Sequence, residues 1–351
     1  MDKVVDLYLN DSSTRRKWKH FLEKLGLNNF SSREIDVIDH TLGLVDDDGN
    51  LVGTGSIAGN VLKYIGVCNE GAQPGARFNK IVTALQQYIF NQRIFHSFVF
   101  TKTKYSKSFQ HLGFNELAHT EQAAFLESGT PDVNAFLDTI PKVKDQKNKK
   151  VAAIVMNANP FTLGHRHLIE LASQENDLVY VFVVATNASL FNTDERMKLV
   201  QAGTADFKNV FVVSGGDYMV SRATFPAYFL KSPDDLVATQ TQIDANVFKN
   251  IIAPRLFINS RYIGTEPFSR TTSFYNQSLI QVLEPSIKVV LVPRYEVNGQ
   301  VITATKVRQL IKDDNLAAIQ KLVPSTTMDF IKNNKEILQD RIKKGMNIDG
   351  N

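Results

Sequence analysis

The sequence predicts an α/β protein with two domains. From residue 151 onward, continuous apolar runs alternate with segments whose apolar residues recur at helical spacing. Such runs indicate strands that are buried on both faces of a parallel sheet and joined by crossover helices. The half before residue 141 is a mixed, strand-rich region, and the chain of 351 residues exceeds the usual size of one domain.

Composition is typical of a globular protein. Hydrophobic residues make up 43% and charged residues 22% of the chain, which is ordinary for a protein that builds cores. A net charge of +4 and a pI near 8.9 suit anionic substrates but are too weakly basic to indicate nucleic acid. With one cysteine, no signal-like start and no spanning apolar run, we expect a cytoplasmic protein without nucleic-acid or membrane partners.

The N-terminal half, residues 1–140, is predicted to be a mixed α+β domain. Its first helix is expected to begin after Asp11 and to end at Gly26, because Trp18, Leu22 and Leu25 share one face. A turn at 46–50 reads as a hairpin connection. The expected elements that follow are strands at 51–57 and 61–68, a helix carrying Ile81, Leu85 and Ile89, a strand at 96–100 and a short helix ending at 112–114.

The C-terminal half begins after a polar, basic segment at 141–150 that we interpret as a linker. A second domain is predicted over 151–330, followed by a C-terminal helix and tail at 331–351, whose last residues from 345 are expected to fray. The expected strands of this domain are 151–156, 178–185, 210–214, 256–258 and 288–292.

The turn from Thr162 to His165 is the first motif that carries chemistry. It follows a buried strand and opens a helix, so backbone N–H groups and the positive end of the helix dipole can attract an anion there. Gly164 lets a ligand approach the backbone, and His165 can stabilise charge on a phosphoryl oxygen. The alternative is a helix cap with a surface histidine.

A second anion-binding candidate is the segment 302–308. Thr305 and Arg308 are three residues apart at the start of a predicted helix, so they share one face near its positive end. A guanidinium and hydroxyl groups together suit a polyphosphate. The alternative is an ordinary threonine cap with a solvent-facing arginine.

Together, these motifs resemble the nucleotidylyltransferase superfamily, whose signature is an early (H/T)xGH turn and a late ISxTxxR segment. The match narrows to the citrate lyase ligase family, which the chain resembles over nearly its whole length. The resemblance is carried by the segments 156–165, 216–226 and 264–267, together with Tyr275 and Asn276. The resemblance implies a Rossmann-like C-terminal sheet with helices on both faces and an N-terminal acetyltransferase-like (GNAT-like) domain.

The family's activity implies that ATP and acetate form acetyl-adenylate and pyrophosphate. A thiol of the phosphoribosyl-dephospho-coenzyme A group on the lyase acyl-carrier subunit then takes the acetyl group, and AMP is released. Mg²⁺ would bridge the phosphates. The resemblance thus names ATP and Mg²⁺ as cofactors, with acetate and the carrier subunit as partners.

Site residues follow from the same resemblance. Thr162 and His165 are assigned to the α-phosphate and Arg308 to pyrophosphate, as catalytic residues. Ser221 and Arg222 are candidates for contact with acetate or phosphate, and no protein ligand for a metal is assigned. Nucleotide-binding roles are expected for a further set: Asn157, Asn159, Pro160, Phe161, Gly164, Gly264, Glu266, Thr303 and Thr305.

The N-terminal half departs from the acetyltransferase pattern (Q/R)xxGx(G/A). The corresponding stretch is 73–78, where Pro74 lacks an N–H and Phe78 replaces a small residue. Classical acyl-CoA binding is therefore in question, and this half is expected to dock the carrier's CoA-like arm or to support the other domain. The alternatives for the whole chain are a nucleotidylyltransferase with a phosphopantetheine-like or other phosphate acceptor, and a non-catalytic carrier-binding protein.

Overall fold

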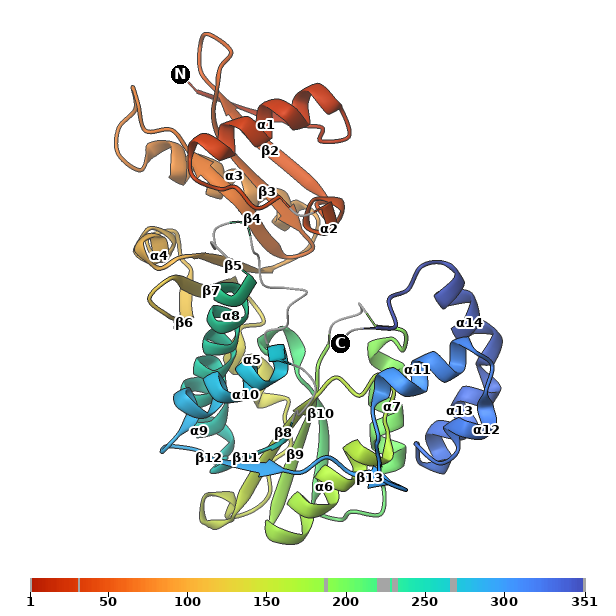
Figure 1. Cartoon of the computed structure of the whole chain (residues 1–351). Helices are drawn as coiled ribbons and strands as arrows, with labels where there is room; N and C mark the ends of the chain where they lie inside the picture. The colour runs from red at the N-terminus through yellow and green to blue at the C-terminus, as the bar shows by residue number, and fades with distance from the viewer. Residues whose placement is uncertain are drawn as a thin grey trace. The chain divides into compact units, whose positions relative to one another are not determined.

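The computed structural model describes residues 2–30, 32–185, 189–219, 228, 233–265 and 270–349. The chain divides into two compact units, which consist of residues 1–136 with 225–243 and of residues 137–224 with 244–351. Each unit contains a sheet of its own (Figure 1). The domain limits expected from the sequence stay a prediction. The first unit also includes residues 225–243, which come after most of the second unit's first half in the sequence and which no change in composition distinguishes.

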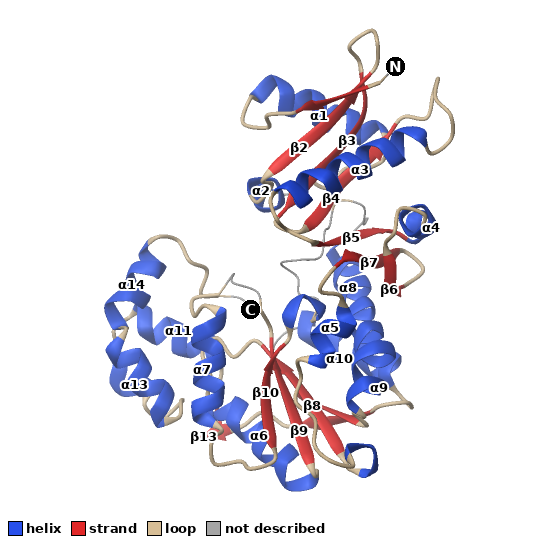
Figure 2. Ribbon diagram, turned by 180° about the vertical axis from the view of Figure 1, so that it is seen from behind, coloured by secondary structure: helices blue, strands red, loops and turns tan. Residues whose placement is uncertain are grey.

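The first unit is built on a seven-stranded sheet with the order β1-β2-β3-β4-β5-β7-β6 among the described residues. Its neighbouring strands are antiparallel, except for β4 and β5, which are parallel. Helices α1 and α3 lie on opposite faces of this sheet (Figures 1 and 2). The mixed α+β architecture expected for this half is confirmed.

The elements of the first unit have the following bounds. The strands are β1 (Lys3–Asp6), β2 (His40–Val45), β3 (Leu51–Ala58), β4 (Val61–Val67), β5 (His96–Lys102), β6 (Asn115–His119) and β7 (Ala123–Gly129). The helices are α1 (Ser12–Lys24), α2 (Ser32–Asp36), α3 (Ala76–Asn91), η1 (Thr103–Tyr105), α4 (Ser106–Gln110) and α5 (Val133–Asp138), which ends in the second unit.

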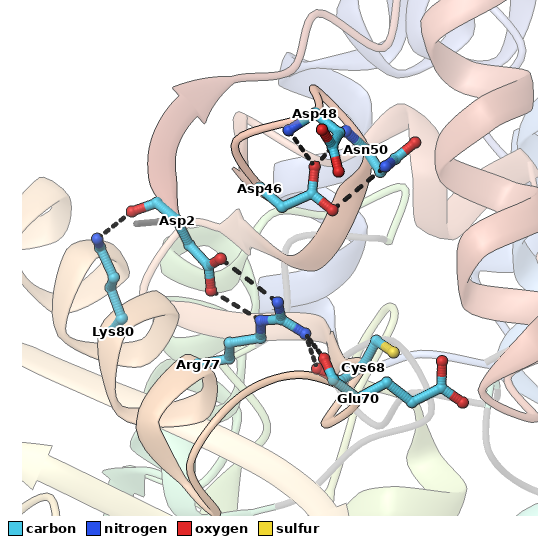
Figure 3. A network of polar contacts seen from close by, with 8 residues as sticks. All are labelled: Asp2, Asp46, Asp48, Asn50, Cys68, Glu70, Arg77 and Lys80. Atoms are coloured by element: carbon cyan, nitrogen blue, oxygen red, sulfur yellow. Dashed lines mark hydrogen bonds and ion pairs between the residues drawn. The ribbon is translucent and has the colours of Figure 1, made fainter.

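Arg77, in the first turn of α3, fastens the loop that precedes this helix. Its guanidinium pairs with Asp2 at 2.7 Å and donates to the carbonyl oxygens of Cys68 and Glu70 (Figure 3). The hydrogen bond from Arg77 lowers the pKa of the Asp2 carboxyl. Arg77 is buried, so a side chain of the protein braces the loop that leads into α3.

The second unit is built on a five-stranded parallel sheet with the order β10-β9-β8-β11-β12 among the described residues. Helices α6 and α7 cover one face of it, whereas η4, α9 and α10 lie toward the other (Figures 1 and 2). Because the strands are parallel, their carboxyl ends meet at one edge, where ligands bind in open α/β sheets. The predicted α/β class with a parallel sheet is confirmed.

The elements of the second unit have the following bounds. Its strands are β8 (Val151–Met156), β9 (Leu178–Val183), β10 (Val210–Ser214), β11 (Ser260–Gly264), β12 (Lys288–Val292), β13 (Glu296–Val297) and β14 (Gln300–Val301). Its helices are η2 (Gln146–Asn148), α6 (Leu163–Glu175), α7 (Thr193–Gly203), η3 (Gly216–Tyr218), α8 (Pro233–Val247, shared with the first unit), η4 (Phe248–Ile252, a π-helix), α9 (Ala253–Leu256), α10 (Arg270–Leu283), α11 (Ala304–Lys312), α12 (Leu316–Ile319), α13 (Ser325–Asn333) and α14 (Lys335–Lys343).

The strand predicted at 256–258 is wrong. Leu256 ends α9, Phe257 has a left-handed backbone conformation with φ of 54°, and the strand begins only at Ser260. The pattern misled because β11 carries Arg261, which is 1% exposed. A charged residue inside a buried strand interrupts the apolar run by which such strands are recognised.

The segment interpreted as a linker is partly buried in the second unit. Gln146, in η2, is 3% exposed, and its amide nitrogen donates to the hydroxyl of Tyr180 at 3.0 Å and to the carbonyl oxygen of Leu256 at 2.7 Å. The segment therefore packs against β9 and the end of α9 through Gln146, although most of its lysines face solvent. Across the described part of the chain, no helix combines the length and hydropathy that crossing a membrane requires.

A close contact between α7 and the turn after β8 generates a stability prediction. A Cβ at Gly203 would lie 2.5 Å from Cε1 of Phe161, whose ring is fully buried. We expect Gly203→Ala to lower the free energy of unfolding by about 1–3 kcal/mol through overpacking. Urea unfolding measures this, with Gln201→Ala on the exposed side of the same helix as the control. Equal midpoints for the two variants would contradict the contact.

Candidate functional site

The candidate site begins where β8 ends and α6 begins. Thr162 is the N-cap of α6, and its hydroxyl accepts from the backbone N–H of His165 at 3.3 Å. In return, Nδ1 of His165 lies 3.1 Å from the backbone nitrogen of Thr162 and 2.9 Å from its hydroxyl oxygen. This reciprocal arrangement is a capping box with histidine at its third position. The expected helix start at this motif is confirmed.

The hydrogen bonds of the capping box assign the tautomer of His165. Nδ1 faces the backbone N–H of Thr162, which can only donate, so Nδ1 must be an acceptor. The proton of the neutral ring therefore resides on Nε2. The residue keeps part of its surface accessible, and Nε2–H is the group that it can offer to a ligand.

The electrostatic surroundings keep this imidazole neutral. Burial of the ring lowers the pKa of His165 to about 4, and the positive charges of Arg294 and Arg308 add to the effect. At neutral pH the ring is therefore an uncharged donor, placed at the positive end of a helix. Thr162 is 2% exposed, so its hydroxyl serves the cap and orients the histidine.

The second motif forms the start of α11. Thr303 is the N-cap, and its hydroxyl accepts from the backbone N–H of Lys306 at 3.1 Å. The hydroxyl of Thr305 instead accepts from Nη2 of Arg308 at 3.0 Å. These contacts confirm the predicted helix start, and they couple the threonine and arginine of the motif to each other.

Arg308 is fully buried and joins distant parts of the chain. Its Nη1 donates to the carbonyl oxygen of Asn159 at 2.6 Å, and its Nε donates to the carbonyl oxygen of Ile348 at 2.8 Å. Burial lowers the pKa of Arg308 to about 10, so the guanidinium is still charged at neutral pH. The two motifs are therefore adjacent, because Asn159 belongs to the turn that leads into α6.

The expectation of a frayed C-terminus from residue 345 is wrong as far as Asp349. Ile348 is 6% exposed and belongs to the hydrophobic core of the second unit, while its carbonyl oxygen binds Arg308. The negative charge of Asp349 partly offsets the effect of burial on the pKa of Arg308. Chain termini are poorly ordered unless they are anchored by contacts with the rest of the domain. Here the anchoring contact is the hydrogen bond from the buried guanidinium of Arg308.

The asparagines of the first turn are engaged within the protein. Asn159 is 2% exposed, and its side-chain oxygen accepts from the backbone N–H of Phe191 at 3.1 Å. The side-chain and carbonyl oxygens of Asn157 both accept from Nη1 of Arg196 at 2.9 Å. Both side chains thus shape the turn, and the nucleotide-binding roles expected for them stay predictions.

The other expected nucleotide-binding residues differ in accessibility. Pro160 and Phe161 are buried, and the ring of Phe161 lies 5.9 Å from that of His165. Gly164 faces the carbonyl oxygen of Ile302, which a Cβ would meet at 3.5 Å. Gly264 ends β11 and accepts a hydrogen bond from the amide of Asn276 at 3.1 Å. Ser221, Arg222 and Glu266 lie outside the described residues.

Two arginines at this edge were missed by the sequence reasoning. Arg196 is fully buried in α7, and it donates to carbonyl oxygens of Asn157, Val184 and Phe191. Nothing in the sequence distinguishes it from a solvated helix arginine. Arg294 lies two residues beyond the end of β12, and this position at the carboxyl end of a predicted strand was a signal that could have identified it.

The first unit contains a cavity of about 150 Å³ where β4 and β5 diverge. In the described register these strands pair only through 61–62 and 98–99, although they continue to Val67 and Lys102. Residues of both strands beyond that point, among them Val67 and Thr101, line the cavity. Tyr228, which follows β10 in the sequence but belongs to this unit, also lines the cavity and stacks on Tyr64 at 4.1 Å.

The tautomer and pKa of His165 can be tested by NMR. Its pKa of about 4 lies below the ordinary 6.5, so between these values the unfolded chain binds a proton that the folded chain does not. Stability should therefore fall as the pH drops through this window. In histidine-labelled protein we expect a midpoint near pH 4 and an Nε2–H ring, and His165→Gln assigns the resonance. A midpoint at or above 6.5 would exclude the neutral donor.

Sequence comparisons identify the family to which this chain is similar. Residues 151–331 match the family model described as the citrate lyase ligase C-terminal domain. A citrate (pro-3S)-lyase ligase from Escherichia coli (strain K12) is 33% identical over 337 residues, which cover 93% of this chain and 95% of that protein. The protein of the same name from Klebsiella pneumoniae is 35% identical over 329 residues, which cover 92% and 94%.

Among solved structures, an N-acetyltransferase from Staphylococcus aureus Mu50 is similar to 37% of this chain over 97% of its own length, with 11% identity and a TM-score of 0.30. Because this TM-score is too low to support an argument about fold, the architecture of the first unit is described from its own strand order alone. The sequence relatives, by contrast, extend over both units. The chain belongs to the citrate lyase ligase family, and it is an enzyme.

Proposed function

We propose that this enzyme is an ATP-dependent acetate:thiol ligase that acetylates the prosthetic-group thiol of the acyl-carrier subunit of citrate lyase. The observation that carries the proposal is the neutral Nε2–H donor of His165 in the first turn of α6, beside the buried charge of Arg308. An uncharged donor and fixed cations at the carboxyl edge of a parallel sheet suit phosphoryl chemistry. Membership of the family supports this reading.

The reaction has two steps. An oxygen of acetate attacks the α-phosphorus of ATP, the new C–O–P linkage forms, and the bond to pyrophosphate breaks. The thiolate of the carrier then attacks the acetyl carbon, a thioester forms, and AMP leaves. Acetate is ionised at neutral pH, so the first step needs no general base. Its barrier is the charge that accumulates on phosphoryl oxygens, which preorganised donors stabilise.

Each residue of the site has a proposed task. Nε2–H of His165 and the orphan N–H groups of α6 stabilise the α-phosphoryl oxygens. Arg308 supplies positive charge toward pyrophosphate and holds the turn at Asn159 in place. Thr303 and Thr305 fix the start of α11. Ser221 and Arg222 keep their proposed contact with acetate or phosphate.

Mg²⁺ is proposed to enter with ATP. The described residues contain no group of three or more His, Cys, Asp or Glu side chains that could hold a metal ion. Phosphate oxygens and water would hold the ion, which is how Mg²⁺ usually binds at nucleotide sites. Bound there, the ion would neutralise charge on the leaving pyrophosphate.

The cavity in the first unit is the proposed docking place for the CoA-like arm of the carrier. The arm is an extended chain with amide groups, and the diverging edges of β4 and β5 offer backbone donors and acceptors to such a chain. Arg77 already braces the loop before α3. The arm is therefore proposed to bind along the strands, rather than through its pyrophosphate at that loop.

The role of His165 can be tested by acetate-dependent exchange of labelled pyrophosphate into ATP. We expect His165→Gln to lower the exchange rate by a factor on the order of 10²–10³, because one preorganised donor is lost. Arg166→Gln, one residue further along α6, changes an ion pair with Asp206 and is the control. Exchange at the wild-type rate in His165→Gln would remove the histidine from the mechanism. Exchange that needs a phosphorylated acceptor instead of acetate would refute the ligase proposal.

The docking role of the first unit has a separate test. Thr101→Trp should fill the cavity between β4 and β5. We expect acetylation of the carrier, measured with labelled acetate and ATP, to fall at least about tenfold because the arm loses its binding slot. Acetate-dependent pyrophosphate exchange should persist. Gln87→Trp, on the exposed side of α3, is the control. Normal carrier acetylation in Thr101→Trp would contradict docking in this cavity.

A further inference from the structure

Arg294 lies in the loop that follows β12, at the same edge of the sheet as the two motifs. Its Nε donates to the carbonyl oxygen of Thr265 at 2.6 Å, and the backbone N–H of Thr265 donates to the carbonyl oxygen of Val292 at 2.8 Å. The guanidinium therefore lies over the end of β11, with Gly264 beneath it: a Cβ at Gly264 would be 3.9 Å from Nε. β11 pairs directly with β8, whose carboxyl end carries the turn into α6.

The residue after Arg294 fixes this loop against both motifs. The ring of Tyr295 packs on the ring of His167 in α6, with centroids 4.7 Å apart. The carbonyl oxygen of Tyr295 accepts from the backbone N–H of Ile302, just before α11, at 3.1 Å. Arg294 is thus held between the two helix starts by contacts on either side of it.

Accessibility separates Arg294 from Arg308. Arg308 is fully buried, and its Nε, Nη1 and Nη2 bind oxygens of Ile348, Asn159 and Thr305. Arg294 is only half-buried. A ligand at this edge can therefore reach the residue Arg294 without disturbing the contacts by which Arg308 holds the C-terminus.

We propose that Arg294 is a further cation of this site and contacts the phosphates of ATP directly, whereas Arg308 acts through its charge and by holding the turn before α6 in place. The inference rests on the proposed function and extends it to a residue that neither motif contains. Its geometric basis is the fixed loop between the starts of α6 and α11. Arg294 and Nε2–H of His165 then contact the same phosphate chain from the carboxyl ends of β12 and β8, which lie on either side of β11. The positive charge of Arg294 also lowers the pKa of His165, ahead of that of Arg308.

Binding of ATP and of adenosine to the full chain, measured by calorimetry, tests the assignment. We expect Arg294→Gln to weaken ATP binding by about 10- to 100-fold, as loss of a charge-assisted contact does, and to leave adenosine binding within about twofold. Arg294→Lys should restore part of the affinity. The matched control is Arg166→Gln, which removes a guanidinium of α6 that pairs with Asp206; its ATP affinity should equal that of the wild type.

A second readout tests whether the charge of Arg294 lies beside His165. The midpoint of His165, followed by NMR, should rise in Arg294→Gln and stay unchanged in Arg166→Gln, because a nearby positive charge is lost only in the former. ATP binding by Arg294→Gln equal to that of the wild type would overturn the assignment while leaving the proposed function intact. A wild-type chain that binds no ATP would overturn both.

Discussion

The candidate site depends on one buried guanidinium. Arg308 joins the turn before α6, through the carbonyl oxygen of Asn159, to the C-terminal segment, through that of Ile348. Those contacts span 149 and 40 residues of sequence. Burying a charge is costly, and a hydrogen bond to a charged group contributes about 1.5–3 kcal/mol. The arrangement therefore allows few alternatives, and the position of His165 follows from it.

The capping box at the start of α6 fixes which nitrogen of His165 can contact a ligand. With Nδ1 committed to the N-cap residue, the ring orientation of His165 is fixed, and only Nε2 remains for a ligand. Burial and two neighbouring arginines keep the ring uncharged. A neutral donor suits a phosphoryl oxygen that gains charge during the reaction, because the hydrogen bond strengthens as the charge grows. The start of α6 adds the field of the helix dipole at the same point.

The sequence was sufficient for much of the fold but for less of the site. Apolar runs predict β8, β9, β10 and β12, and motif residues predict both helix starts, because these features depend on local patterns. Arg261 concealed β11, since a buried charge inside a strand has no sequence signature. For the same reason, Arg308 was expected to face a ligand. Whether a guanidinium binds protein carbonyls or a phosphate depends on tertiary contacts, which residue spacing does not contain.

The buried arginines of the second unit explain why this edge of the sheet favours anions. Arg196 and Arg308 are fully buried, and the hydrogen-bond partners described for them are carbonyl, amide and hydroxyl oxygens, which satisfy donors without cancelling charge. Burial lowers the pKa of each to about 10, so both stay protonated at neutral pH. A third buried arginine of this unit, Arg261, lies 3.6 Å from the carboxylate of Asp244. Two protonated guanidinium groups therefore lie near the carboxyl ends of β8 and β9, and positive charge at this edge of the sheet favours an anion such as a polyphosphate.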